Sequence, residues 1–90
     1  MSDYFYKDPD AVLDYVFDWS DWLETGETIS SHTVTALTGI TKDSDAESSG
    51  LVTVWLSAGT AGKEYTVACE IVTSSLRTDE RTIRIMVKER

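Results

Sequence analysis

The sequence predicts an all-β fold, an antiparallel immunoglobulin-like β-sandwich that forms one small domain over residues 1–90. Three observations predict it. Apolar residues alternate with polar ones along several short segments that are rich in β-branched and aromatic side chains. Turn-forming residues separate these segments, and no convincing long helical pattern interrupts them. Tyr65 opens a late segment directly after a glycine turn, like the tyrosine corner of immunoglobulin-like domains, although no cysteine pair accompanies it.

The first predicted strand runs from Val12 to Trp19. Its alternation places four large residues on one buried face: Leu13, Tyr15, Phe17 and Trp19. A helix over residues 10–23 is the competing interpretation, because Pro9 suits the first turn of a helix. The alternation and the aromatic content favour the strand.

The next part of the chain gives weaker signals. A second strand is predicted over Thr28–Leu37, with Ile29, Val34 and Leu37 as its buried residues. Its alternation is poor, which is typical of an edge strand or a bulged strand. Residues 41–50 are almost entirely polar, so they are predicted to form a loop and to be the most mobile part of the molecule.

Three clearer strands follow. They are predicted over Leu51–Ser57, Glu64–Thr73 and Arg81–Lys88, joined by a glycine turn at residues 58–62 and a hairpin connection at residues 74–80. Alternation assigns these side chains to the interior: Val52, Val54, Leu56, Tyr65, Val67, Cys69, Ile71, Ile83, Ile85 and Val87. Trp55 falls on the opposite face of its strand, which makes it a candidate interface residue.

The charge of the chain restricts its partners. The formal net charge is −8, which disfavours nucleic acid and anionic membrane surfaces, because both are bound by clustered Lys and Arg. Residues 1–50 carry eleven acidic and two basic side chains, and residues 51–90 carry five acidic and six basic ones. This asymmetry indicates either a solvated acidic face or two complementary surfaces that suit head-to-tail contacts in a ring.

No residue pattern supports catalysis or a cofactor. His32 is the only histidine and is expected at a surface or edge, while Cys69 is expected to be a small buried residue. The acidic run from Asp43 to Glu47 lacks the glycine and the final glutamate of a calcium loop. No apolar run reaches the roughly 20 residues of a membrane span, and no signal peptide is expected. We therefore expect a protein without enzymatic activity, cofactor or metal.

A surplus of aromatic side chains remains to be explained. Tyr4, Phe5 and Tyr6 precede the first strand, where they either cover an edge of the sandwich or form a docking arm within residues 1–9. Aromatic anchors carry much of the binding energy of protein interfaces. The predicted partner-binding residues are Tyr4, Phe5, Tyr6, Asp21, Trp22 and Trp55.

Three blocks of sequence carry a resemblance to a known family. The run from Lys7 through Asp10 and Leu13-Asp14-Tyr15 to Asp18-Trp19-Ser20-Asp21-Trp22-Leu23 is similar to small tailed-phage structural proteins of the fiber-tail adaptor or head-tail connector type. Residues 53–67 and 77–81 are similar to later blocks of the same family. The resemblance implies an immunoglobulin-like virion component that is made in the host cytoplasm. It also implies a non-enzymatic neck or tail subunit, which forms an oligomeric ring and contacts other phage proteins.

Two other functions are compatible with the residues. One is a capsid decoration protein that cements the head shell from outside. The other belongs to a different class, a carbohydrate-binding β-sandwich whose exposed Trp and Tyr side chains stack on sugars.

Overall fold

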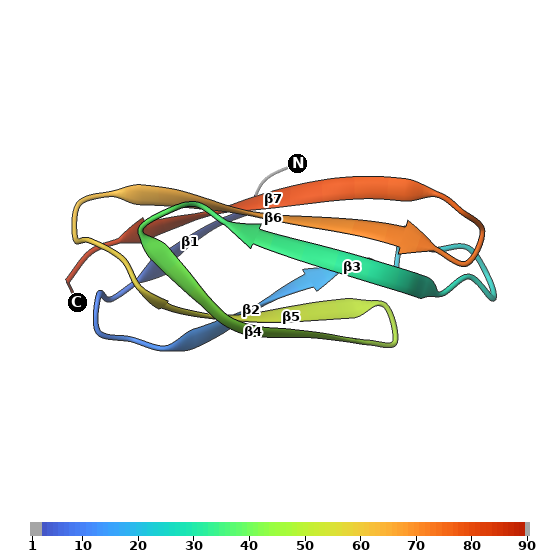
Figure 1. Ribbon diagram of the computed structural model, residues 1–90, viewed down its shortest axis with the longest axis horizontal. Coiled ribbons are helices and arrows are strands. Elements are labelled where there is room, and N and C mark those ends of the chain that lie inside the picture. Colours follow the sequence, from blue (N-terminus) through green and yellow to red (C-terminus); the bar gives the residue numbers. More distant parts are fainter. Residues whose placement is uncertain (1–2, 90) are drawn as a thin grey trace.

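The computed structural model describes residues 3–89, with the side chain of residue 3 excepted, and shows seven strands and no helix in this part of the chain. The strands are β1 (Asp3–Lys7), β2 (Leu13–Asp18), β3 (Ile29–Ala36), β4 (Ile40–Ser48), β5 (Leu51–Ala58), β6 (Glu64–Thr73) and β7 (Thr78–Val87) (Figure 1). The predicted all-β class is confirmed. Within these residues no helix could cross a membrane.

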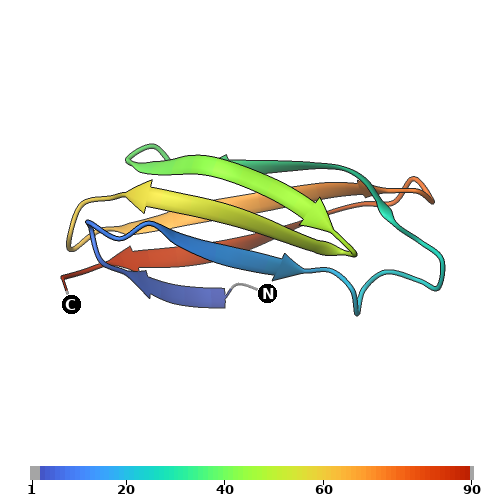
Figure 2. The same ribbon diagram turned by 90° about the horizontal axis from the view of Figure 1, so that it is seen from below.

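The strands form two sheets that pack face to face (Figures 1 and 2). One sheet has the order β1-β7-β6-β3 and the other the order β2-β5-β4. These orders are compatible with an immunoglobulin-type sandwich, in which the corresponding strands would be G-F-C and B-E-D. All the strand pairs are antiparallel as predicted except one, since β1, which was not predicted as a strand, pairs with β7 in parallel. A parallel pair needs a long crossover connection, and here the rest of the chain supplies it.

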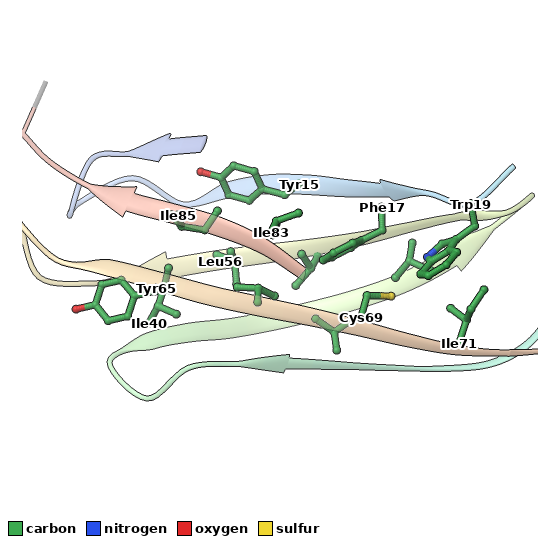
Figure 3. Close-up of a cluster of buried hydrophobic side chains, with 14 of the residues drawn as sticks. Tyr15, Phe17, Trp19, Ile40, Leu56, Tyr65, Cys69, Ile71, Ile83 and Ile85 are labelled. Atoms are coloured by element: carbon green, nitrogen blue, oxygen red, sulfur yellow. The ribbon is translucent and has the colours of Figure 1, made fainter. Parts of the chain in front are cut away.

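The core lies between the two sheets and is built from the inward residues of every strand except the short β1 (Figure 3). Three of the four residues predicted to be buried on the first strand, Tyr15, Phe17 and Trp19, lie in this core. Leu13 does not, since 38% of its surface is exposed. It is the first residue of β2, the outermost strand of its sheet, so a neighbouring strand covers it on one side only.

Residues 41–50 form a strand and a turn where a polar loop was predicted. β4 pairs with β5 along its whole length, from Ile40 opposite Ala58 to Ser48 opposite Leu51. Ser49 and Gly50 close this hairpin with φ angles of 53° and 84°, which is the backbone of a two-residue hairpin turn. The loop prediction failed because β4 is an edge strand with exposed side chains and a bulge, so its sequence lacks an alternating pattern.

The remaining boundaries differ by a few residues from the predicted ones. β6 spans the predicted residues, β5 continues to Ala58, and β7 begins at Thr78. Leu37 was predicted to be buried but is 48% exposed, because β3 ends at Ala36 and Leu37 already belongs to the turn. Cys69 is buried as predicted, and burial raises the pKa of its thiol to about 11.

Tyr65 bonds back to the backbone, as the comparison with a tyrosine corner predicted. Its hydroxyl oxygen accepts a hydrogen bond of 2.9 Å from the backbone N–H of Thr60. The ring passes so close to Gly39 that a Cβ atom there would lie 2.7 Å from Cε1 of Tyr65. Gly39 also has a φ of 111°, so both the backbone conformation and the space require glycine.

Candidate interaction surfaces

The aromatic residues that precede β2 lie on a strand of the sandwich. In β1 the side chains alternate, and Phe5 points inward against the ring of Tyr15, with ring centroids 5.1 Å apart. Tyr4 and Tyr6 point outward and are 46% and 49% exposed. Their rings meet edge to face with centroids 5.5 Å apart. Of the three aromatic residues, two are therefore free to meet a partner and one belongs to the interior.

The buried side chain of Lys7 ties β1 to the opposite sheet. Its Nζ donates hydrogen bonds to the backbone oxygens of Ala58 (2.7 Å) and Asp8 (2.9 Å), and burial lowers the pKa of Lys7. Its backbone oxygen accepts a bond from the N–H of Lys88 (2.9 Å). These bonds fix the end of β1 next to the ends of β5 and β7. Tyr6 therefore stands on a well-connected strand.

Tyr4 and Tyr6 form part of a larger outward surface. The parallel register places Tyr4 beside Arg84 and Tyr6 beside Met86, and Nζ of Lys88 lies 5.0 Å from the centroid of the Tyr6 ring. We call these five residues the tyrosine face. Glu64 lies at the border of this face, with its Oε2 atom 3.7 Å from Nη1 of Arg84. Arg84, Lys88 and Glu64 together therefore carry a net charge of +1.

A second aromatic surface lies on the outer side of the other sheet. Trp55, 42% exposed, occupies the central strand β5, with Asp14 opposite it on β2. Val16 is the next outward residue of β2 and is 44% exposed. Asp43 on β4 accepts a hydrogen bond from Ser57, the next outward residue of β5 after Trp55. We call Asp14, Val16, Asp43 and Trp55 the tryptophan face; its charged side chains are acidic.

The predicted contact residue Trp22 lies inside a cluster at the far end of the sandwich. Its ring meets Trp19 edge to face at 5.5 Å, and the guanidinium of Arg77 covers it at 4.0 Å. The guanidinium of Arg81 covers Trp19 at 4.2 Å. We call these four residues the tryptophan–arginine cluster. Asp21, by contrast, is exposed in the turn that precedes Trp22.

Glu27 anchors this cluster, and sequence reasoning missed it. The buried carboxylate accepts hydrogen bonds from Nε of Arg77 (2.9 Å), from the hydroxyl of Thr73 and from the N–H of Glu24 (2.9 Å). The bond to Arg77, followed by those to Glu24 and Thr73, lowers the pKa of Glu27 to about 2. The pair is separated by fifty positions in the sequence. No local pattern could reveal it.

The tryptophan–arginine cluster joins two of the three blocks that carry the family resemblance. Residues 18–23 and 77–81 are far apart in the sequence but meet here through ring and guanidinium contacts. A hollow of about 700 Å³ lies beside them and includes Glu24, Glu27 and Glu47 in its lining. Among the described residues, no group of potential ligands could hold a metal ion.

The single histidine joins two edge strands that belong to different sheets. Nε2 of His32 on β3 lies 2.7 Å from Oδ1 of Asp45 on β4, and Nζ of Lys42 lies 2.7 Å from the other oxygen. Lys42 is the main cause of a lowered pKa at Asp45. This agrees with the expected edge position of His32 and gives it a structural contact.

Comparison with known protein families assigns this chain to one of them. The family described as podophage GP4 fiber-tail adaptor protein gp77 matches residues 7–86. The chain belongs to this family. No curated protein matches it.

The fiber-tail adaptor family covers nearly all of the sandwich. The matched residues include β2 to β6, almost all of β7, Trp55 and the tryptophan–arginine cluster. Tyr4 and Tyr6 lie before the match, whereas Arg84 and Met86 of the same face lie within it. The resemblance to the fiber-tail adaptor type inferred from the sequence is confirmed: the chain belongs to a family of phage tail adaptor proteins.

Proposed function

We propose that this chain is a non-enzymatic tail subunit of the virion, made in the host cytoplasm, that assembles in an oligomeric ring. In the proposal it binds neighbouring tail or head-tail proteins through its exposed aromatic side chains. The family match over residues 7–86 carries the proposal. The exposed rings of Tyr4, Tyr6 and Trp55 support it, since rigid aromatic side chains on strands lose little entropy on binding.

The six predicted contact residues fall into two groups, four that are exposed and two that are partly buried. Tyr4, Tyr6, Trp55 and Asp21 are exposed and are proposed to touch partners directly. Phe5 and Trp22 are partly buried and pack against the core. We propose that these two position the exposed residues beside them, Phe5 by fixing β1 and Trp22 by fixing the turn that carries Asp21.

The test uses a phage that lacks this gene and is complemented with plasmid-borne variants. Particles without the protein should have tails that lack fibers, and wild-type protein should restore them. Trp55→Thr and the double variant Tyr4→Thr/Tyr6→Thr should enter particles poorly, because threonine keeps strand propensity but removes the ring. The control is Leu76→Asn, which removes a side chain that is 86% exposed and lies outside both faces.

Fibers are counted by electron microscopy and the protein is located by gold labelling. Label at the tail, with fiber loss in the aromatic variants alone, supports the proposal. Label scattered over the head would instead indicate a decoration protein. Fibers on particles that lack the protein altogether would refute the adaptor role.

A further inference from the structure

We propose that copies of this chain bind one another head to tail, with the tyrosine face of one copy packed against the tryptophan face of the next. The inference deepens the proposed function and rests on it, since it names the contact that would build the ring. It comes from the positions and charges of the two faces. A single copy carries both faces and cannot bring them together.

The two faces lie on opposite outer surfaces of the sandwich. β1 and β7 carry the tyrosine face in one sheet, and β2, β4 and β5 carry the tryptophan face in the other. Phe5 and Tyr15 point between the sheets, so Tyr4 and Tyr6 point away from them, and Trp55 points away on the other side. A copy packed on one face therefore leaves the other face free for a further copy.

Both faces also lie toward the same end of the long axis. Nζ of Lys7, next to Tyr6, bonds to the backbone oxygen of Ala58, three positions after Trp55. Figure 2 shows β1 and β5 ending on the same side of the molecule. Copies joined through these faces would lie side by side with like ends together. Such an arrangement builds a ring or collar if the rotation between copies closes.

The charges of the two faces are complementary. The tyrosine face carries Arg84 and Lys88, and the tryptophan face carries Asp14 and Asp43. Each face combines these charges with apolar surface, from the tyrosine rings and Met86 on one side and from Trp55 and Val16 on the other. Opposite charge around an aromatic centre fixes the orientation of a contact and excludes wrong ones.

A symmetric dimer satisfies these features less well. In a two-fold contact each face meets itself, so Lys88 would approach Arg84 or Lys88 of its partner, and Asp14 would approach acidic groups. The second aromatic face would also stay exposed to water. Head-to-tail packing removes both problems because each copy offers one basic and one acidic face.

Cysteine cross-linking tests the contact without changing its centre. Thr66 of β6 is exposed and pairs with Arg84 of β7. Ser44 of β4 is exposed and pairs with Trp55 of β5. The double variant Thr66→Cys/Ser44→Cys therefore places one thiol at the border of each face. The native Cys69 is fully buried and stays outside the reaction. Assembled particles and purified protein are treated with a flexible bis-maleimide.

The expected result is a ladder of two, three and more linked chains from the double variant. Neither single variant should cross-link alone, and a mixture of the two should stop at dimers. Dimers from a single variant would indicate a two-fold contact and overturn the inference. So would the absence of any ladder in fiber-bearing particles that contain the protein, a result that leaves the adaptor function standing.

A second arm tests the side chains themselves. Adding Tyr4→Thr and Tyr6→Thr, or Trp55→Thr, to the double cysteine variant should reduce the ladder at least tenfold, because interface aromatic residues are frequent hot spots. Adding Leu76→Asn should leave it unchanged. An undiminished ladder in the aromatic variants would overturn the assignment of these faces. Purified protein gives the result even where a variant enters particles poorly.

Discussion

At the scale of single residues, the position of Trp22 depends on one carboxylate that it does not touch. Glu27 holds the guanidinium of Arg77, and Arg77 in turn covers the indole ring of Trp22 and donates a bond of 3.3 Å to its backbone oxygen. A planar guanidinium can donate hydrogen bonds to a carboxylate and stack on an aromatic ring at the same time. The ammonium group of a lysine does this less well. The charge of Glu27 therefore controls the order of the turn that follows β2.

This dependence predicts an acid-sensitive stability. The pKa of Glu27 is about 2 in the folded chain, below its ordinary value of 4.5. A lowered folded pKa gives a stabilisation that is complete above pH 4.5 and is lost as the pH falls toward 2. Glu27→Gln should be less stable than wild type at neutral pH and should show a flatter decline in this acid range.

Urea unfolding at a series of pH values, followed by tryptophan fluorescence, measures this difference. Glu64→Gln is the matched control, since it removes a looser pair whose atoms are 3.7 Å apart and whose side chains are exposed. It should keep the wild-type pH dependence. Parallel curves for wild type and Glu27→Gln would contradict the assigned role of Glu27.

At the scale of elements, the sequence predicted strands well where one face is buried and poorly where it is not. β6 alternates from Tyr65 to Ile71 between two neighbouring strands, and its bounds were predicted without error. β4 also pairs with its neighbour along its length, with one bulge, but its side chains are mostly exposed and polar. Hydrogen bonds to β5 hold it, and such bonds leave no periodic trace in the sequence.

The turn between β3 and β4 gives a prediction about packing. A Cβ atom at Gly39 would lie 2.7 Å from the Tyr65 ring, whereas one at Gly62 would have nothing within 4 Å. Both glycines have positive φ angles, 111° and 88°. Gly62→Ala should cost about 1–2 kcal/mol of unfolding free energy from backbone strain alone. Gly39→Ala should cost about 3 kcal/mol, since it also displaces a buried ring.

Chemical denaturation of the two variants gives the comparison. Both glycines have a positive φ, so the larger loss at Gly39 reports chiefly its contact with Tyr65. Adding Tyr65→Phe to each should leave that difference in place, since the ring and not the hydroxyl lies nearest to Gly39. Equal losses for the two glycine variants would show that the turn moves away without cost.

At the scale of the whole molecule, the sequence indicated which residues are unusual but not where they meet. The outward position of Trp55 followed from simple alternation. The union of residues 18–23 with residues 77–81 did not, because only the pairing of distant strands brings Arg77 and Arg81 onto the two tryptophans. The placement of Tyr4 and Tyr6 opposite Trp55 likewise depends on β1 joining β7 in parallel.

The charge of the whole molecule provides the last prediction. If opposite faces of successive copies meet, Lys88→Glu and Asp14→Lys should each weaken self-association several-fold, because each removes an attractive charge from one face and adds a like charge toward the other. The chain that carries both changes should recover much of the loss, since the charges at positions 88 and 14 are then exchanged and attract each other again. Sedimentation at low and high salt measures this, and salt should reduce the differences. Failure of the double reversal to recover association would show that these charges do not face each other.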